Sequence, residues 1–119
     1  MDSIINGLLR IQQQLRILHW QTKSYARHKA YGKTYDELGD LIDEFMEVQM
    51  GKYGRFELQD KTIPLENLEE MTVSDFIDDS IAFLTDLTNK VDPKDSDLLN
   101  IRDEMLAKMN RLKYLLTLK

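Results

Sequence analysis

Four runs of apolar residues at helical spacing constrain the fold of this chain more than any other feature. Within each run the apolar residues recur at steps of three and four, which places them on one face of a helix. The runs extend from Ile4 to Leu18, Tyr31 to Phe45, Val73 to Val91 and Leu98 to Leu116. Only two prolines and five glycines occur in 119 residues, whereas a fold of many short strands needs more turn-forming residues. The sequence therefore predicts an all-α protein with helices at roughly 3–24, 27–51, 73–91 and 96–117.

The connection between the second and third predicted helices is much longer than the other two. Residues 52–71, KYGRFELQDKTIPLENLEEM, lose the helical periodicity and contain Pro64. A short, long, short order of connections is typical of a ferritin-like bundle, in which the middle connection runs the length of the bundle. A plain antiparallel bundle, which needs only a short middle loop, is the alternative. We expect a single domain over residues 1–119 with the ferritin-like four-helix fold and a long crossover between helices 2 and 3.

The composition excludes several classes of function. Without cysteine the chain cannot build a disulfide framework or a thiolate metal site, so any metal must be held by His, Asp and Glu. The net charge of −5 argues against general binding of nucleic acid. No run approaches the roughly 18 apolar residues that span a bilayer, and the first residues lack the features of a signal peptide. We therefore expect a cytoplasmic protein without membrane contact.

Both histidines and the only tryptophan lie in one segment, LHWQTKSYARHK, as His19, Trp20 and His28. Four carboxylates follow on the second predicted helix at steps of four, three and four: Asp36, Asp40, Asp43 and Glu47. Such a stripe is usually a solvated helix face, although like charges four residues apart repel unless a cation lies nearby. A metal site is the second interpretation. For each histidine alone, a packed or helix-flanking ring remains the simpler interpretation, and Trp20 is most simply a core or interface anchor.

The distance between these residues decides what kind of metal site they could form. Fifteen residues of helix separate His28 from Asp43 by about 22 Å, so one chain cannot place both on the same ion. Two antiparallel copies of this helix across a two-fold axis would bring His28 of one chain beside Asp43 and Glu47 of the other. Two imidazoles, with His19 as the second, and two carboxylates suit Fe(II), Mn(II) or Zn(II). If these residues bind metal, the protein is a homo-oligomer, at least a two-fold dimer.

The segment HWQTKSYARHKAYGKTYDELGDLIDEFME resembles the diagnostic region of the Dps-type miniferritins. Those proteins carry a His-Trp-Asn motif late in helix one and a second His near the start of helix two. An Asp and a Glu follow that second His after fifteen and nineteen residues. Here His19-Trp20-Gln21 is similar to the first motif, and His28, Asp43 and Glu47 match both spacings. The C-terminal stretch DSDLLNIRDEMLAKMNRLKYLLTL is also similar to the last helix of that family.

The resemblance implies a ferritin-like fold with an iron site across a two-fold interface and with His19, His28, Asp43 and Glu47 as its ligands. In that family the site oxidises Fe(II), usually with hydrogen peroxide, and ferric mineral is stored inside a twelve-subunit cage. We therefore expect an iron-binding protein with ferroxidase-type activity, for which manganese and zinc are alternative metals. Trp20, Asp36 and Asp40 are the auxiliary candidates, because Trp20 could intercept oxidising equivalents and the two acids could complete the ligand set.

Several departures from the family keep other functions open. The turn between the two histidines is about one helical turn shorter than in the family, and Gly32 stands where many members have an acid. The competing hypothesis is a ferritin-fold structural or interaction protein that has lost its metal chemistry. DNA binding is not supported, since the chain lacks the basic tail that some members use. Its only basis would be a local basic patch comprising Arg10, Arg16, Lys23, Arg27, Lys29 and Lys33.

Overall fold

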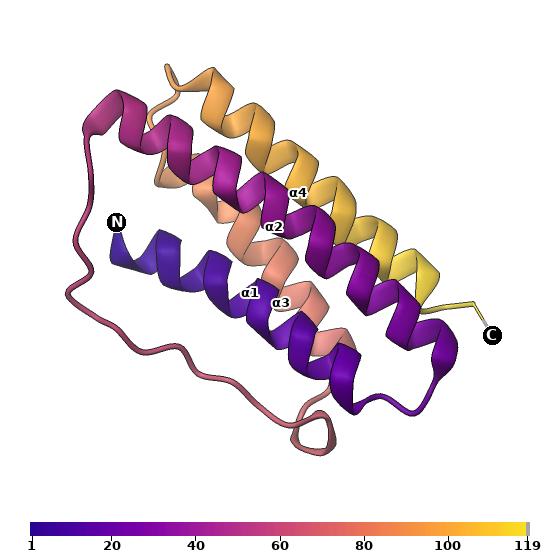
Figure 1. The fold of residues 1–119 in the computed structure, drawn as a ribbon. Coiled ribbons are helices and arrows are strands. Elements are labelled where there is room, and N and C mark those ends of the chain that lie inside the picture. The colour runs from indigo at the N-terminus through magenta and orange to yellow at the C-terminus, as the bar shows by residue number, and fades with distance from the viewer. Residues whose placement is uncertain (119) are drawn as a thin grey trace.

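The computed structural model describes residues 1–118, which form four α-helices and no strand (Figure 1). The helices are α1 (Asp2–Gln21), α2 (Tyr25–Tyr53), α3 (Val73–Asp86) and α4 (Ser96–Leu115), with short 3-10 turns η1 (Leu68–Glu70) and η2 (Leu87–Asn89). The prediction of an all-α fold with four helices is therefore confirmed. Lys119, the last residue of the predicted domain, lies outside the described residues.

The boundaries of the helices differ from the predicted ones by a few residues, and most at the end of the third helix. It was expected to reach residue 91, but α3 ends at Asp86 and the chain tightens into η2. The reason is the buried side chain of Arg102 on α4, whose Nη1 donates to the carbonyl oxygens of Leu84 and Thr85 at 3.0 and 3.3 Å. The guanidinium thus satisfies carbonyl groups that the end of a helix leaves unpaired.

The long connection from α2 to α3 runs along α1 from its first turn to its last. Five polar side chains of α1 bind its backbone: Asp2, Asn6, Arg10, Gln14 and Gln21. Their partners lie, in the same order, between Gln59 and Leu68. Because the connection returns along α1, α3 begins at the end of the molecule where α2 begins (Figure 1). Helices α2 and α3 therefore run in one direction, and α1 and α4 run in the other.

The four apolar faces meet in one core. Its buried members include Leu8, Leu15 and Leu18 of α1, Tyr31, Leu38 and Phe45 of α2, Phe76 and Leu84 of α3, and Leu98, Met105, Met109 and Leu112 of α4. Full burial of a side chain of this size stabilises the fold by about 1.5–3 kcal/mol. No helix within residues 1–118 combines the length and the apolar character that crossing a membrane requires.

Two groups of ion pairs join α2 to α4. Glu37, near the middle of α2, lies 2.6 Å from the Nζ of Lys108 and 3.6 Å from Arg111. At the end of α2, the Nζ of Lys52 lies 3.0 Å from Asp95 and 2.8 Å from Asp97, and the hydroxyl of Tyr53 donates to Asp95. These contacts hold α2 along α4, whereas Asp36, Asp40 and Asp43 of the same helix stay exposed.

Candidate functional site

His19 and His28 lie face to face across the turn that joins α1 to α2. Their ring centroids are 3.8 Å apart and the ring planes are inclined by 14°. The Nδ1 of His19 lies 2.7 Å from the backbone oxygen of His28, and the Nδ1 of His28 lies 2.8 Å from the backbone oxygen of His19. A carbonyl oxygen can only accept, so each Nδ1 carries a hydrogen and donates it. The two residues thus form a reciprocal pair that fixes the turn.

This pairing determines which nitrogen of each histidine can bind a metal. In a neutral imidazole with its hydrogen on Nδ1, the lone pair lies on Nε2. Metal-binding histidines commonly have this arrangement, with Nδ1 donating to a carbonyl and Nε2 on the ion. The near-parallel rings of His19 and His28 nevertheless keep their lone pairs in separate planes. The two rings therefore do not converge on one ion at the metal–nitrogen distance of about 2.0–2.1 Å.

Gly32 provides the space that the His19 ring occupies on α2. A Cβ at position 32 would lie 2.8 Å from Cε1 and 2.9 Å from Nδ1 of that ring. Contacts this short force something to move, so the ring packs on the helix only because residue 32 has no side chain. The departure from the miniferritin pattern at this position thus has a structural reason in this chain.

Asp43 and Glu47, the predicted carboxylate ligands, lie on the solvent side of α2, away from the histidine pair. Asp36, Asp40, Asp43 and Glu47 are all exposed. Within one chain, Asp36 lines a hollow of about 570 Å³ together with His19 and His28, but Asp43 and Glu47 do not. Since α2 is one unbroken helix, His28 and Asp43 remain about 22 Å apart along its axis. Within residues 1–118 no three His, Asp or Glu side chains come close enough to hold an ion.

Trp20 does not belong to the core of a single chain, because its side chain is 64% exposed. The guanidinium of Arg16 lies 4.3 Å from the ring of Tyr35 and 5.7 Å from the ring of Trp20. The three side chains line a second hollow, which shares Gly32 with the first. Of the two interpretations of Trp20, core anchor is wrong for the isolated chain, and interface anchor stays a prediction.

The six basic residues considered for DNA binding fall into two groups in the structure. Arg10 donates to the carbonyl oxygen of Pro64, and Arg16 stacks on Tyr35, so both serve contacts within the chain. The other four, at positions 23, 27, 29 and 33, gather around the α1–α2 turn and the first turns of α2. The expectation that the chain does not bind DNA stays a prediction.

Sequence reasoning missed a division of charge along the exposed face of α2. The basic residues Lys29 and Lys33 occupy its first half, and the carboxylates that follow, from Asp36 to Glu47, occupy its second half. The positions are symmetric, because Lys29 and Glu44 are equally far from the point between Asp36 and Glu37. Lys33 and Asp40 are equally far from the same point. This symmetry was readable in the sequence as equal spacings of opposite charge.

An uncharacterized 14.6 kDa protein from the mobD-ri intergenic region of Enterobacteria phage T4 is 46% identical over 54 residues, which cover 45% of this chain and 42% of that protein. The match thus spans less than half the length of that relative. No solved structure matches the chain. The model of a family of unknown function, DUF5856, matches residues 19–116. Because the match covers most of the chain, including both histidines and all four predicted carboxylates, this protein belongs to the DUF5856 family.

Proposed function

We propose that this protein is a ferritin-like homo-oligomer, at least a two-fold dimer, that binds Fe(II) between subunits and oxidises it. One observation carries the proposal. His28, Asp43 and Glu47 are exposed on a single unbroken helix, and the Nδ1 bond of His28 leaves its Nε2 as the ligating atom. These are the donors that suit Fe(II), and only a second chain could bring them together.

The path of the chain supports the ferritin-like part of this proposal. The connection between α2 and α3 runs along the whole of α1, so that α2 and α3 point in the same direction. A bundle with one long crossover has this order of helices, and a bundle with only short connections does not.

The charges on α2 favour an antiparallel dimer in one register. A two-fold axis passing between Asp36 and Glu37 would set Lys33 of each chain opposite Asp40 of the other, and Lys29 opposite Glu44. The same axis would set His28 opposite the space between Asp43 and Glu47. A parallel arrangement would instead place the acidic halves together, which is unfavourable. The register that pairs the charges is therefore also the one that assembles the ligands.

In such a site Fe(II) is the substrate, and the residues of the two chains bind and stabilise it. Asp43 and Glu47, one helical turn apart, would hold the ion with carboxylate oxygens, and His28 of the other chain would add a nitrogen. Two Fe(II) ions would each give one electron to one molecule of hydrogen peroxide, which takes up two protons and leaves as two water molecules. The carboxylates would stabilise the additional positive charge of Fe(III). Asp36 and Asp40 raise the local concentration of cations by their charge.

The geometry of the histidine pair favours the second candidate, a structural or interaction protein of the same fold. The reciprocal bonds give both rings a complete structural role in the turn, and their planes do not converge on one ion. Under this alternative His19 and His28 only hold α1 against α2, and the exposed face of α2 binds a protein partner.

Mixing two inactive variants tests whether the site lies between chains. His28→Ala and the double variant Asp43→Asn/Glu47→Gln should each fail to bind Fe(II) in anaerobic titrations. A dimer of one chain of each kind contains one complete site, formed by the intact His28 and the intact carboxylates. Mixed chains, after unfolding and refolding together, should therefore recover binding in about half of the dimers. Full loss in the mixture, or binding by either variant alone, would contradict the proposal.

A further inference from the structure

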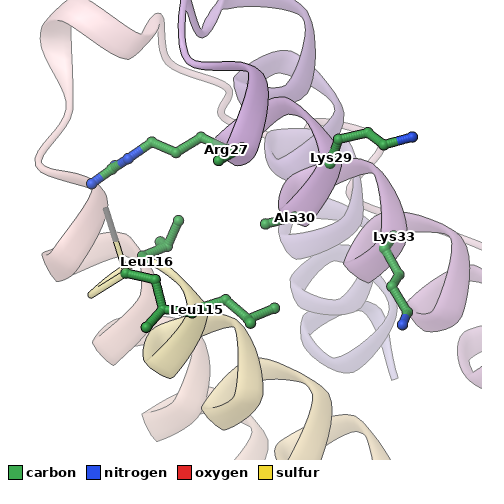
Figure 2. A pocket seen from close by; sticks show the side chains of 8 residues that line it. Arg27, Lys29, Ala30, Lys33, Leu115 and Leu116 are labelled. Atoms are coloured by element: carbon green, nitrogen blue, oxygen red, sulfur yellow. The ribbon is translucent and has the colours of Figure 1, made fainter.

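Two adjoining hollows lie at the end of the bundle where α2 begins and α4 ends. The first, of about 290 Å³, separates the start of α2 from the residues around the end of α4, and Figure 2 shows Ala30 facing Leu115 and Leu116 across it. The second, of about 240 Å³, continues toward α3 and is lined by Val73 and Ile77. Both contain Arg27 and Leu116, so Arg27 stands where the two hollows meet.

The residues among 1–118 that line these hollows are apolar or positively charged, apart from Ser74 and Thr117 in the second hollow. The apolar side chains of the first hollow are Ala26, Ala30, Leu115, Leu116 and Leu118. Its polar members are Arg27, Lys29 and Lys33, and Lys113 is added in the second hollow. Within residues 1–118 no carboxylate lines either one, although the chain carries a net charge of −5 and Asp36 lines both hollows beside His19.

Arg27 is the cation best placed to bind a ligand here. Its side chain is half-buried and extends over the edge of the groove, whereas Lys29 and Lys33 turn outward (Figure 2). Its Nη1 donates to the hydroxyl of Tyr31 at 3.4 Å, and no carboxylate within residues 1–118 forms an ion pair with it. Lys113 differs, since it is already paired with Asp78 at 2.8 Å.

We propose that this end of the bundle binds an anionic single-chain amphiphile, such as a free carboxylate with an alkyl tail. Arginine binds a carboxylate through two parallel hydrogen bonds, which gives the head group a defined position at Arg27. The tail would cover the apolar surface of Ala30, Leu115 and Leu116, which is otherwise in water. The volume of the two hollows together falls in the lower half of the usual range for ligand sites, about 300–1,000 Å³, so a chain of medium length fits better than a bulky lipid.

The test is calorimetric titration of the full chain with sodium dodecanoate below its critical micelle concentration. We expect saturable binding, with amide NMR shifts at Ala26, Ala30 and Leu116.

Arg27→Gln should weaken the binding of dodecanoate about tenfold or more, because one charge-assisted contact is lost. Ala26→Trp, at an exposed position, should fill the groove and weaken binding with Arg27 intact. Lys94→Gln removes an equal charge at the other end of the molecule and should change nothing. Circular dichroism confirms that each variant is folded.

Four results would overturn this proposal. Equal binding of dodecyltrimethylammonium would show that the charge at Arg27 plays no part, as would unchanged affinity in Arg27→Gln. Binding to phosphatidylglycerol vesicles without binding of free dodecanoate would assign the patch to a membrane surface. Absence of dodecanoate binding together with self-association that Ala26→Trp abolishes would assign the groove to a second copy of the chain. None of these outcomes involves His28, Asp43 or Glu47, so they leave the proposed iron site untouched.

Discussion

The ring of His19 packs directly against the backbone of Gly32. Position 32 therefore has no room for a side chain. Gly32→Ala should displace the ring and break both reciprocal bonds, at a cost of about 1–3 kcal/mol as for other overpacked sites. Urea unfolding measures the loss. Gly51→Ala is the matched control, because a Cβ at position 51 meets nothing within 4 Å. It should stabilise α2 by up to about 1 kcal/mol.

A double-mutant cycle identifies the cause of that loss. With His19 replaced by alanine the ring is gone, so Gly32→Ala should no longer cost stability and should stabilise α2 as Gly51→Ala does. An equal cost with and without the ring would show that the close packing of Gly32 and His19 does not matter in solution.

At the same scale, the sequence identified the histidines but not their relation to each other. Reciprocal pairing depends on how a three-residue turn folds back, which spacing alone does not show. Gly32 was interpreted as a lost acid, although a glycine four residues after His28 on a helix could have suggested a close approach. The charge symmetry of Lys33 and Asp40 was available in the sequence and was overlooked.

The crossover is held by five polar side chains of α1, of which only that of Gln14 is buried. This residue is fully buried, donates to the backbone oxygen of Glu66 and accepts from its backbone nitrogen, both at 2.9 Å. Gln14→Leu removes both bonds, each worth about 0.5–1.5 kcal/mol, because water replaces the amide at the backbone of the exposed Glu66. Hydrogen exchange should become faster in residues 59–68 while the helices stay protected. Gln13→Leu serves as control, and equal exchange in both variants would contradict this role.

The contact between the last residues of α2 and the start of α4 makes the stability of the fold depend on pH. The hydroxyl of Tyr53 and then the ammonium of Lys52 hold the pKa of Asp95 below its usual range. A lowered pKa in the folded state gives stability that is present above the ordinary Asp value of about 3.9 and is lost as the pH falls through the folded value. The melting temperature of Asp95→Asn should therefore lie below that of the wild type near pH 7, and the two should converge below about pH 4. A difference that stays constant down to acid pH would contradict this.

The helices themselves were predictable because each apolar stripe is long and regular. The sequence predicted that a long crossover exists, but it did not predict which residues bind it. The polar residues of α1 that do so have the spacing of an ordinary solvated helix face. The end of α3 was missed for another reason. It depends on Arg102, which lies on a different helix and far along the chain.

For the whole molecule, the proposed dimer makes a prediction that needs no metal. Lys33→Glu should weaken self-association about tenfold, because it places like charges opposite each other at two symmetric positions. Adding Asp40→Lys to the same chain exchanges the two charges and should restore association. Lys61→Glu changes the net charge equally but lies on the exposed crossover, so it should leave association unchanged. Sedimentation velocity measures all four proteins, and a double variant no better than Lys33→Glu alone would exclude this register.

The central claim, that an iron site lies between two chains, is tested most directly by an anaerobic Fe(II) titration followed by addition of hydrogen peroxide. The wild type should bind about one or two ions per chain and then develop ferric absorbance. Glu47→Gln should do neither while remaining folded and dimeric, since it removes the charge of one ligand and keeps its shape. If the wild type does not bind Fe(II), or if Glu47→Gln binds and oxidises it equally well, the account of this face of α2 as a metal site is wrong.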